Sequence, residues 1–136
     1  MFKKAFIVLF CAVFILSVYL LNAEPVFDGE KIEVYTVSGS SNALIKTVDK
    51  YEYLFLPTVK GESVRLNADG FDVLKLLNDY DAKMIMIERL DGVECYYAYS
   101  SKIRYREIIG GKRVNLQIAV RGEIVTVGSP IIYGSF

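Results

Sequence analysis

The chain has 136 residues, 53% of them hydrophobic, and its 16 basic and 16 acidic side chains cancel. It contains no histidine, which excludes Ser-His-Asp and Cys-His catalytic sites and zinc sites that need imidazole. The two cysteines, Cys11 and Cys95, are too few for a zinc site made of cysteines alone. The length predicts one domain behind an N-terminal segment, and we expect no cofactor and no metal.

The N-terminal segment has the layout of an export signal. Lys3 and Lys4 precede an uncharged apolar run over residues 5–21, the order of a basic n-region and a hydrophobic h-region. The best cleavage point follows Ala23, but Leu21 stands where a small residue is preferred, so an uncleaved membrane anchor is the alternative. Either outcome predicts an extracytoplasmic protein, secreted or anchored to the outer face of the cytoplasmic membrane by its N-terminus.

We therefore divide the chain into a signal peptide or membrane anchor (1–23), a short polar linker (24–30) and a single α+β domain (31–136). Cys95 is the only cysteine of that domain, so no internal disulfide can form and folding does not depend on an oxidising compartment. We interpret this cysteine as a small buried hydrophobe rather than as a nucleophile.

The first half of the domain gives mixed signals. Residues 31–37 alternate as a strand does, and residues 61–66 are typical of a further short strand. Residues 42–50 suit either a helix or a strand, and we favour a helix. Residues 51–56 are apolar and aromatic and stop at Pro57, which predicts an edge strand or a loop.

A helix is predicted to begin at Asp69. Asp69 would be its N-cap and Asp72 would lie in its first turn, where the helix macrodipole favours carboxylates. Phe71, Leu74 and Leu77 then fall on one helix face, which should pack on the sheet.

The strongest local signal is Asp-Gly at 91–92, between the apolar runs Lys83–Leu90 and Val93–Ser100. It predicts a two-residue β-hairpin, because a type I′ turn needs positive φ at both central positions. Closing the turn there places Arg89 opposite Glu94 as a cross-strand charge pair.

The first strand of this hairpin is apolar on both faces, with Met84 and Met86 on one face and Ile85 and Ile87 on the other. A strand of this kind is expected in the interior of a sheet. On the second strand we expect Tyr97 to face the helix.

Two further turn signals follow the hairpin. Glycines at 110–111 separate predicted strands at 103–109 and 113–121, and Gly122-Glu123 suits a type II′ turn into a strand at 124–127. The predicted fold class is α+β: an antiparallel five-stranded meander with at least one helix packed on one face.

Three short motifs in the last third are Tyr97-x-Tyr99-Ser100, Val114-Asn115-Leu116-Gln117 and Val127-Gly128-x-Pro130. On these motifs the chain resembles the YwmB-like family, an uncharacterised secreted family of spore-forming Gram-positive bacteria, over about residues 60–136. The resemblance implies a curved sheet backed by helices, like that of the TATA-binding protein. It implies no catalytic residues, and a fold shared with a DNA-binding protein does not imply DNA binding.

The charges beyond the N-terminal segment are segregated. Residues 24–99 hold 8 basic and 14 acidic side chains, whereas residues 100–122 hold 6 basic and 1 acidic. A two-residue turn at 110–111 would pair Arg106 with Asn115 and Arg104 with Gln117, which gathers arginines and amides on one sheet face. The predicted anion-binding face consists of Arg104, Arg106, Arg113, Arg121, Asn115 and Gln117. Arginine's planar fork suits carboxylates and phosphates, although a solvated outer face explains the same pattern.

We therefore expect a non-enzymatic exported cell-envelope domain that binds an anionic wall or membrane component, or a protein partner, through this cationic face. An uncleaved signal would add the membrane as a partner, through residues 5–21. Beyond residue 23 the net charge is −2, so we expect no nucleic-acid partner. The alternative is a small cell-wall-active enzyme or inhibitor with a carboxylate-only site, and a third interpretation is a structural assembly module.

Overall fold

The computed structural model describes residues 1–22, 24–29, 31–37, 43–56 and 59–134. Ala23, after which cleavage is predicted, and Pro57 lie outside these residues. The helices are α1 (Phe2–Asn22), α2 (Lys50–Leu54) and α3 (Val73–Asp79). The strands are β1 (Ile32–Val37), β2 (Ala43–Val48), β3 (Val59–Asn67), β4 (Lys83–Leu90), β5 (Val93–Tyr99), β6 (Glu107–Ile109), β7 (Lys112–Val114), β8 (Leu116–Arg121) and β9 (Ile124–Ser129).

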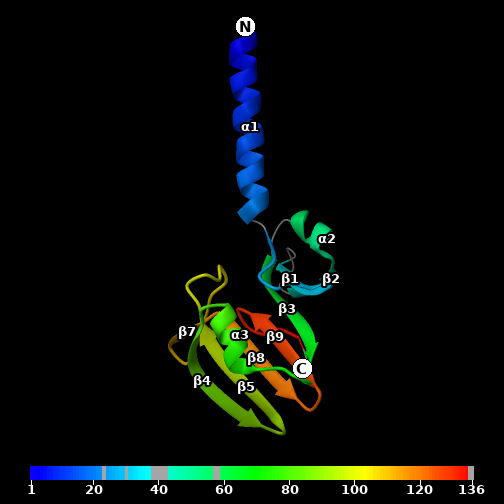
Figure 1. The fold of residues 1–136 in the computed structure, drawn as a ribbon, viewed down its shortest axis with the longest axis vertical. Helices are drawn as coiled ribbons and strands as arrows, with labels where there is room; N and C mark the ends of the chain where they lie inside the picture. Colours follow the sequence, from blue (N-terminus) through cyan, green and yellow to red (C-terminus); the bar gives the residue numbers. More distant parts are fainter. Residues whose placement is uncertain (23, 30, 38–42, 57–58, 135–136) are drawn as a thin grey trace.

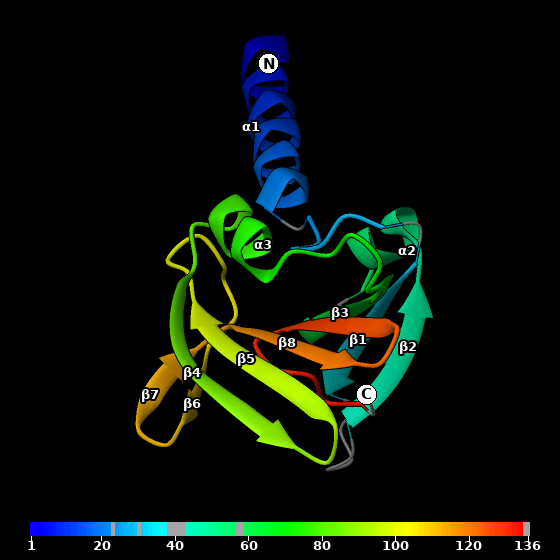
Figure 2. The same ribbon diagram turned by 60° about the horizontal axis from the view of Figure 1, so that its bottom comes forward.

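Seven strands form one sheet in the order β2-β1-β3-β9-β8-β5-β4, and β6 and β7 form a separate two-stranded ribbon (Figures 1 and 2). Every neighbouring pair in the large sheet is antiparallel. The predicted α+β class, with an antiparallel sheet and a helix on one face, is therefore confirmed. The strand connectivity differs from an unbroken meander, because β5 pairs directly with β8. The β6–β7 ribbon, which comes between them in the chain, lies outside the large sheet.

The β4–β5 hairpin has the predicted register. Asp91 has φ 50° and Gly92 has φ 76°, as a type I′ turn requires. Arg89 lies opposite Glu94, and the Arg89 Nε donates to the Glu94 Oε1 at 2.5 Å. Local turn chemistry thus determines this part of the fold.

The position of β4 corrects a prediction, because this strand forms an edge of the sheet instead of lying inside it. Its apolar side chains need no second neighbouring strand: Met84 packs against the core, while Ile87 and Leu90 are 46% and 73% exposed. The register also shifts between Met84 and Met86, and bulges of this kind are a common way of protecting a sheet edge.

The core has two parts, one on each face of the sheet. The larger part includes Ala98, which is fully buried, and Tyr96 packs against it. The smaller part consists of Cys95, Ala119 and Ile132, and Tyr97 packs there. The prediction for Tyr97 is therefore wrong: Ala98 faces the larger core beneath α3, and strand alternation turns its neighbour to the opposite face.

Two predictions for the first half of the domain are also wrong: the helix over residues 42–50, and the edge strand or loop over residues 51–56. Residues 43–48 form β2, which pairs with β1, and not a helix. The helix comes directly after it as α2, because Asp49 caps it and Glu52 completes a capping box. The sequence signal Asp49-x-x-Glu52 was present, but the aromatic residues that follow favoured a strand.

Helix α3 begins later than predicted. Asp72 is its N-cap, with the side chain accepting from the Leu74 amide at 2.9 Å. Gly70 upstream has φ 70°, a left-handed conformation that no α-helix contains. The helix turns Val73, Leu76 and Leu77 toward the core, which leaves Leu74 71% exposed, while Leu77 is buried as predicted.

Candidate functional site

The six side chains of the predicted anion-binding face do not lie on one face. The β6–β7 ladder begins with the predicted pair Ile109 and Lys112 but ends after three pairs, at Glu107 and Val114. The next amide, of Asn115, donates to the Ala98 carbonyl at 3.0 Å, so the chain passes there into the large sheet. The predicted pairs beyond that point therefore do not form.

The two amides of the predicted face are buried and structural. Asn115 is fully buried, and its side chain accepts from the Ser100 amide at 2.8 Å and donates to the Ser100 carbonyl at 2.6 Å. Gln117 is 4% exposed and accepts from the Ile132 amide at 2.8 Å, which holds the C-terminal segment on the sheet. Both amides brace the fold and are not presented to a ligand.

The arginines separate into three places. Arg106 and Arg113 stay together on the ribbon, where they line a shallow hollow of about 360 Å³ with Glu107 and the exposed Ile108. Arg121 lines a different hollow, of about 310 Å³, at the β4–β5 hairpin. Arg104 lies at the end of the domain from which α1 emerges, beside Glu24.

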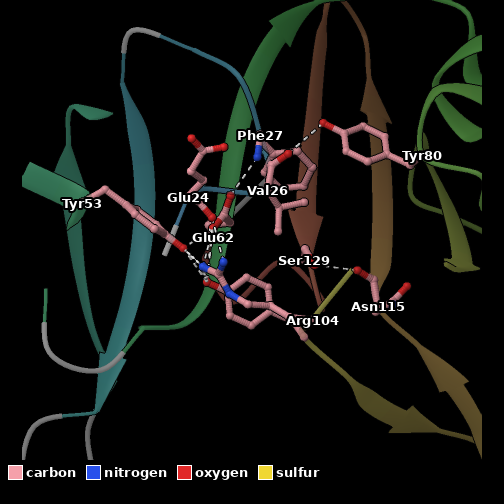
Figure 3. Close-up of polar contacts among 10 residues, drawn as sticks. Glu24, Val26, Phe27, Tyr53, Glu62, Tyr80, Arg104, Asn115 and Ser129 are labelled. Atoms are coloured by element: carbon pink, nitrogen blue, oxygen red, sulfur yellow. Dashed lines mark hydrogen bonds and ion pairs between the residues drawn. The ribbon is translucent and has the colours of Figure 1, made fainter. Parts of the chain in front are cut away.

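The most connected polar group of the domain surrounds Glu62 of β3, whose side chain is fully buried (Figure 3). Its Oε1 accepts from the Phe27 amide at 2.8 Å. Its Oε2 accepts from the phenol of Tyr53 at 2.7 Å and from that of Tyr105 at 3.2 Å. The guanidinium of Arg104, next to Tyr105 in the chain, also lies 3.9 Å from this carboxylate, so three distant segments meet β3 at one carboxylate.

Arg104 extends this network to the segment that follows α1. Its Nη1 donates to the Glu24 carbonyl at 2.7 Å, and its Nη2 donates to the phenols of Tyr53 and Tyr105. The guanidinium also lies over the Tyr105 ring, 4.8 Å from the centroid, in a cation–π contact.

Residues 24–27 are thus built into the domain and do not form the predicted polar linker. Phe27 is 2% exposed and packs edge-to-face on Tyr80, with ring centroids 5.9 Å apart. The Tyr80 hydroxyl donates to the Val26 carbonyl at 3.1 Å. We call residues 24–27 the exit segment, because they follow α1 directly.

Burial sets the electrostatics of the Glu62 network. Removal from water raises the pKa of the Glu62 carboxyl above its ordinary 4.5, opposed by the hydrogen bonds from Tyr53 and Phe27 and by the charge of Arg104. Burial, with the negative charge of Glu62 as the second cause, raises the pKa of the Tyr53 and Tyr105 phenols.

The Glu62 network has no open position for a substrate. Among the described residues, every buried side-chain nitrogen and oxygen has a hydrogen-bond partner. An acid–base catalyst must reach the proton that it transfers, and the Glu62 oxygens contact only the protein's own groups. What this arrangement can do is hold the exit segment on the sheet.

Sequence reasoning missed Glu62, Tyr53 and Phe27. One available signal was an acidic residue at the second position of the predicted strand 61–66. A second was the apolar pair Val26 and Phe27 inside the supposed linker. Neither signal identifies the partners, which lie up to 43 residues from Glu62 in the sequence.

The remaining reactive groups also have structural explanations. Cys95 is buried, which raises the pKa of its thiol and disfavours the nucleophilic thiolate. The Ser100 hydroxyl donates to the Tyr80 carbonyl at 2.5 Å and accepts from the Lys102 amide at 3.1 Å, so it stabilises a turn. Among the described residues, no group of three or more acidic or cysteine side chains is placed to hold a metal ion.

We compared the chain with protein families, curated proteins and solved structures, and none of them matches it. The resemblance to the YwmB-like family and to the TATA-binding-protein fold therefore stays a prediction.

Proposed function

We propose that this chain is a non-enzymatic domain of the cell envelope, anchored by α1 to the outer face of the cytoplasmic membrane, that binds an anionic wall polymer through the β6–β7 ribbon. The observation that carries the proposal is the pairing of Arg106 and Arg113 around the exposed Ile108, on a ribbon that leaves the sheet. The ribbon is the part of the predicted cationic face that stays together in the fold.

The N-terminal helix and the exit segment support the anchor. Residues Phe2–Tyr19 of α1 are long and apolar enough to cross a membrane, and none of them is buried against the domain. Such a helix is compatible with a signal peptide as well as an anchor. Bonds to the Glu24 and Val26 carbonyls fold the residues just beyond Ala23 into the domain, so an α1 that is not cleaved would hold the domain directly at the membrane.

The charge of the ribbon supports an anionic ligand. Arg106, Lys112 and Arg113 are exposed, and Glu107 is the one acid between residues 106 and 113. Burial and the neighbouring Glu107 carboxylate raise the pKa of the Tyr133 phenol, so this carboxylate already interacts with the C-terminal segment. Two guanidinium forks beside an apolar side chain suit phosphate or carboxylate groups repeated along a polymer.

The test compares retention of the full chain on immobilised poly(glycerol phosphate). Arg106→Gln with Arg113→Gln removes two ribbon charges, and we expect weaker retention that is also less sensitive to salt. Lys31→Gln with Lys46→Gln removes the same charge from exposed sites outside the ribbon and should weaken retention less. Equal loss in both variants would mean that only net charge matters, and full retention in the ribbon variant would contradict the proposal.

One observation keeps the enzyme or inhibitor interpretation as a second candidate. Glu88 and Asp91 line the same 310 Å³ hollow as Arg121, so two carboxylates share one concave site. Both are exposed, however, whereas acid–base pairs need two carboxyls in different environments. Hydrolysis of wall polymer that disappears in Glu88→Gln would favour this candidate over the binding domain.

A further inference from the structure

Helix α2 and its C-cap residue present two aromatic side chains to solvent. Tyr51 is 77% exposed and Phe55 is 84% exposed, whereas Tyr53 between them is 3% exposed. At about 100° per residue, positions four apart share a helix side and the position midway points to the opposite side. The helix is therefore held to the domain by Tyr53 and displays Tyr51 and Phe55 together, which we call the α2 aromatic pair.

The Glu62 network places this pair close to the end of α1. The Tyr53 hydroxyl and the Phe27 amide donate to the two oxygens of the same carboxylate, so α2 and the exit segment share one anchor point. Both ribbon views show α2 at the end of the domain from which α1 emerges (Figures 1 and 2). In the sequence, Ala23 alone separates the last residue of α1 from the exit segment.

Combining these observations, we infer that the α2 aromatic pair inserts into the headgroup layer of the bilayer that α1 crosses, and so holds the domain against the membrane in one orientation. The inference rests on the proposed anchoring. Tyrosine is enriched at membrane–water interfaces, where its apolar ring and polar tip both find suitable surroundings, and phenylalanine lies on the apolar face of helices that bind there.

The charges around the pair are compatible with this position. Lys50 precedes Tyr51 in the helix, and a lysine can extend its ammonium group to the headgroups while its stem stays apolar. The nearby acids are turned to the helix cap instead. Asp49 accepts from the Tyr51 amide at 2.9 Å, and Glu52 accepts from the Asp49 amide at 3.1 Å.

Exposed apolar side chains at the other end of the domain provide a matched control. Leu90, at the tip of the β4–β5 hairpin, is 73% exposed, about as much as Tyr51. Both views show this tip at the end of the domain away from α1. Nonspecific adsorption of exposed apolar groups predicts equal lipid contact at the two ends of the domain. The inference predicts that only the α2 end contacts lipid.

The chain contains no tryptophan, so a single introduced tryptophan reports one position. We would reconstitute the full chain in phosphatidylcholine–phosphatidylglycerol vesicles as Phe55→Trp and, separately, as Leu90→Trp. Phe55→Trp should show a blue-shifted emission and a loss of fluorescence in vesicles of lipid brominated near the headgroup. Leu90→Trp should keep the emission of an exposed tryptophan and lose none.

Each of the other possible results of this experiment would contradict a different part of the inference. If the protein floats with the vesicles but Phe55→Trp is not quenched, α1 anchors the chain and the α2 aromatic pair does not touch lipid. Equal quenching at both positions would mean that the domain lies on the membrane without the proposed orientation. If the protein fails to float, the anchor itself is wrong, and the membrane contact of α2 is wrong with it.

Discussion

The two ends of the domain hold ion pairs of opposite character. At the far hairpin, Arg89 and Glu94 approach to 2.5 Å, with side chains 68% and 41% exposed. At the α1 end, Arg104 and Glu62 are 3.9 Å apart, but the Glu62 side chain is fully buried. The Arg89–Glu94 pair should contribute less to stability, although it is shorter, because water screens exposed charges. Removing one partner there leaves the other charge in water and not buried.

This difference separates a local structure from a long-range one. The hairpin pair joins residues five apart, which a single turn brings together. The Glu62 network joins the exit segment, α2, β3 and the chain before β6, and its contacts are lost together if one segment leaves. The α1 end should therefore respond strongly to single substitutions, and the hairpin end weakly.

The largest effect is expected for the exit segment. Phe27→Ala removes a buried ring from the larger core and should lower the free energy of unfolding by about 3–5 kcal/mol. Phe55→Ala removes the same ring from an 84% exposed position and should change stability little in detergent. Urea denaturation of both variants checks this, and similar midpoints would show that the exit segment is a loose linker after all.

The second largest effect on stability is expected for the buried carboxylate of Glu62. Glu62→Ala removes the shared acceptor of the Phe27 amide and two phenols and the negative charge beside Arg104, which should reduce stability by roughly 3 kcal/mol. Glu94→Ala breaks an ion pair that is shorter but exposed, and its melting temperature should stay near that of the unchanged protein. A larger loss for Glu94→Ala would reverse the proposed contrast between the two ends.

A smaller effect should appear in the pH dependence of stability. Because burial raises the pKa of Glu62 above its ordinary 4.5, the folded state binds more protons than the unfolded state between 4.5 and the raised value. The free energy of unfolding contributed by this group therefore falls as pH rises through that window. Glu62→Gln cannot ionise and should flatten the slope in denaturation curves measured from about pH 4 upward. The exposed Glu123→Gln should keep the slope, and an unchanged slope in Glu62→Gln would contradict the assignment.

The smallest effect belongs to the hairpin turn. Gly92→Ala forces a side chain into a backbone with φ 76° and should reduce stability by about 1 kcal/mol. Gly29→Ala is the matched control, because a Cβ there meets the Lys31 carbonyl oxygen at 3.6 Å, an ordinary contact. A melting temperature for Gly92→Ala equal to that of Gly29→Ala would argue against the type I′ turn.

The candidate site was predictable only where it depended on neighbours in sequence. Arg106 and Arg113 stay together because the two-residue turn at 110–111 sets the register that joins Ile108 to Arg113. Arg104 and Gln117 were expected to pair by continuing that register, which assumes that the ladder runs on. The β6–β7 ladder ends where the Asn115 amide donates to the Ala98 carbonyl of β5. This bond depends on the position of β5, which the local sequence does not specify.

What the sequence determined by itself is the local geometry of the chain: the apolar run of α1, the Asp91-Gly92 turn and the pairing of Arg89 with Glu94. These follow from backbone φ preferences and side-chain periodicity, which act over a few residues. Only the tertiary structure decided that β4 forms an edge, that Val26 and Phe27 pack into the core and that Arg104 pairs with Glu62. The physical reason is that a buried carboxylate must find donors wherever the folded chain supplies them, and nothing in the nearby sequence marks those donors in advance.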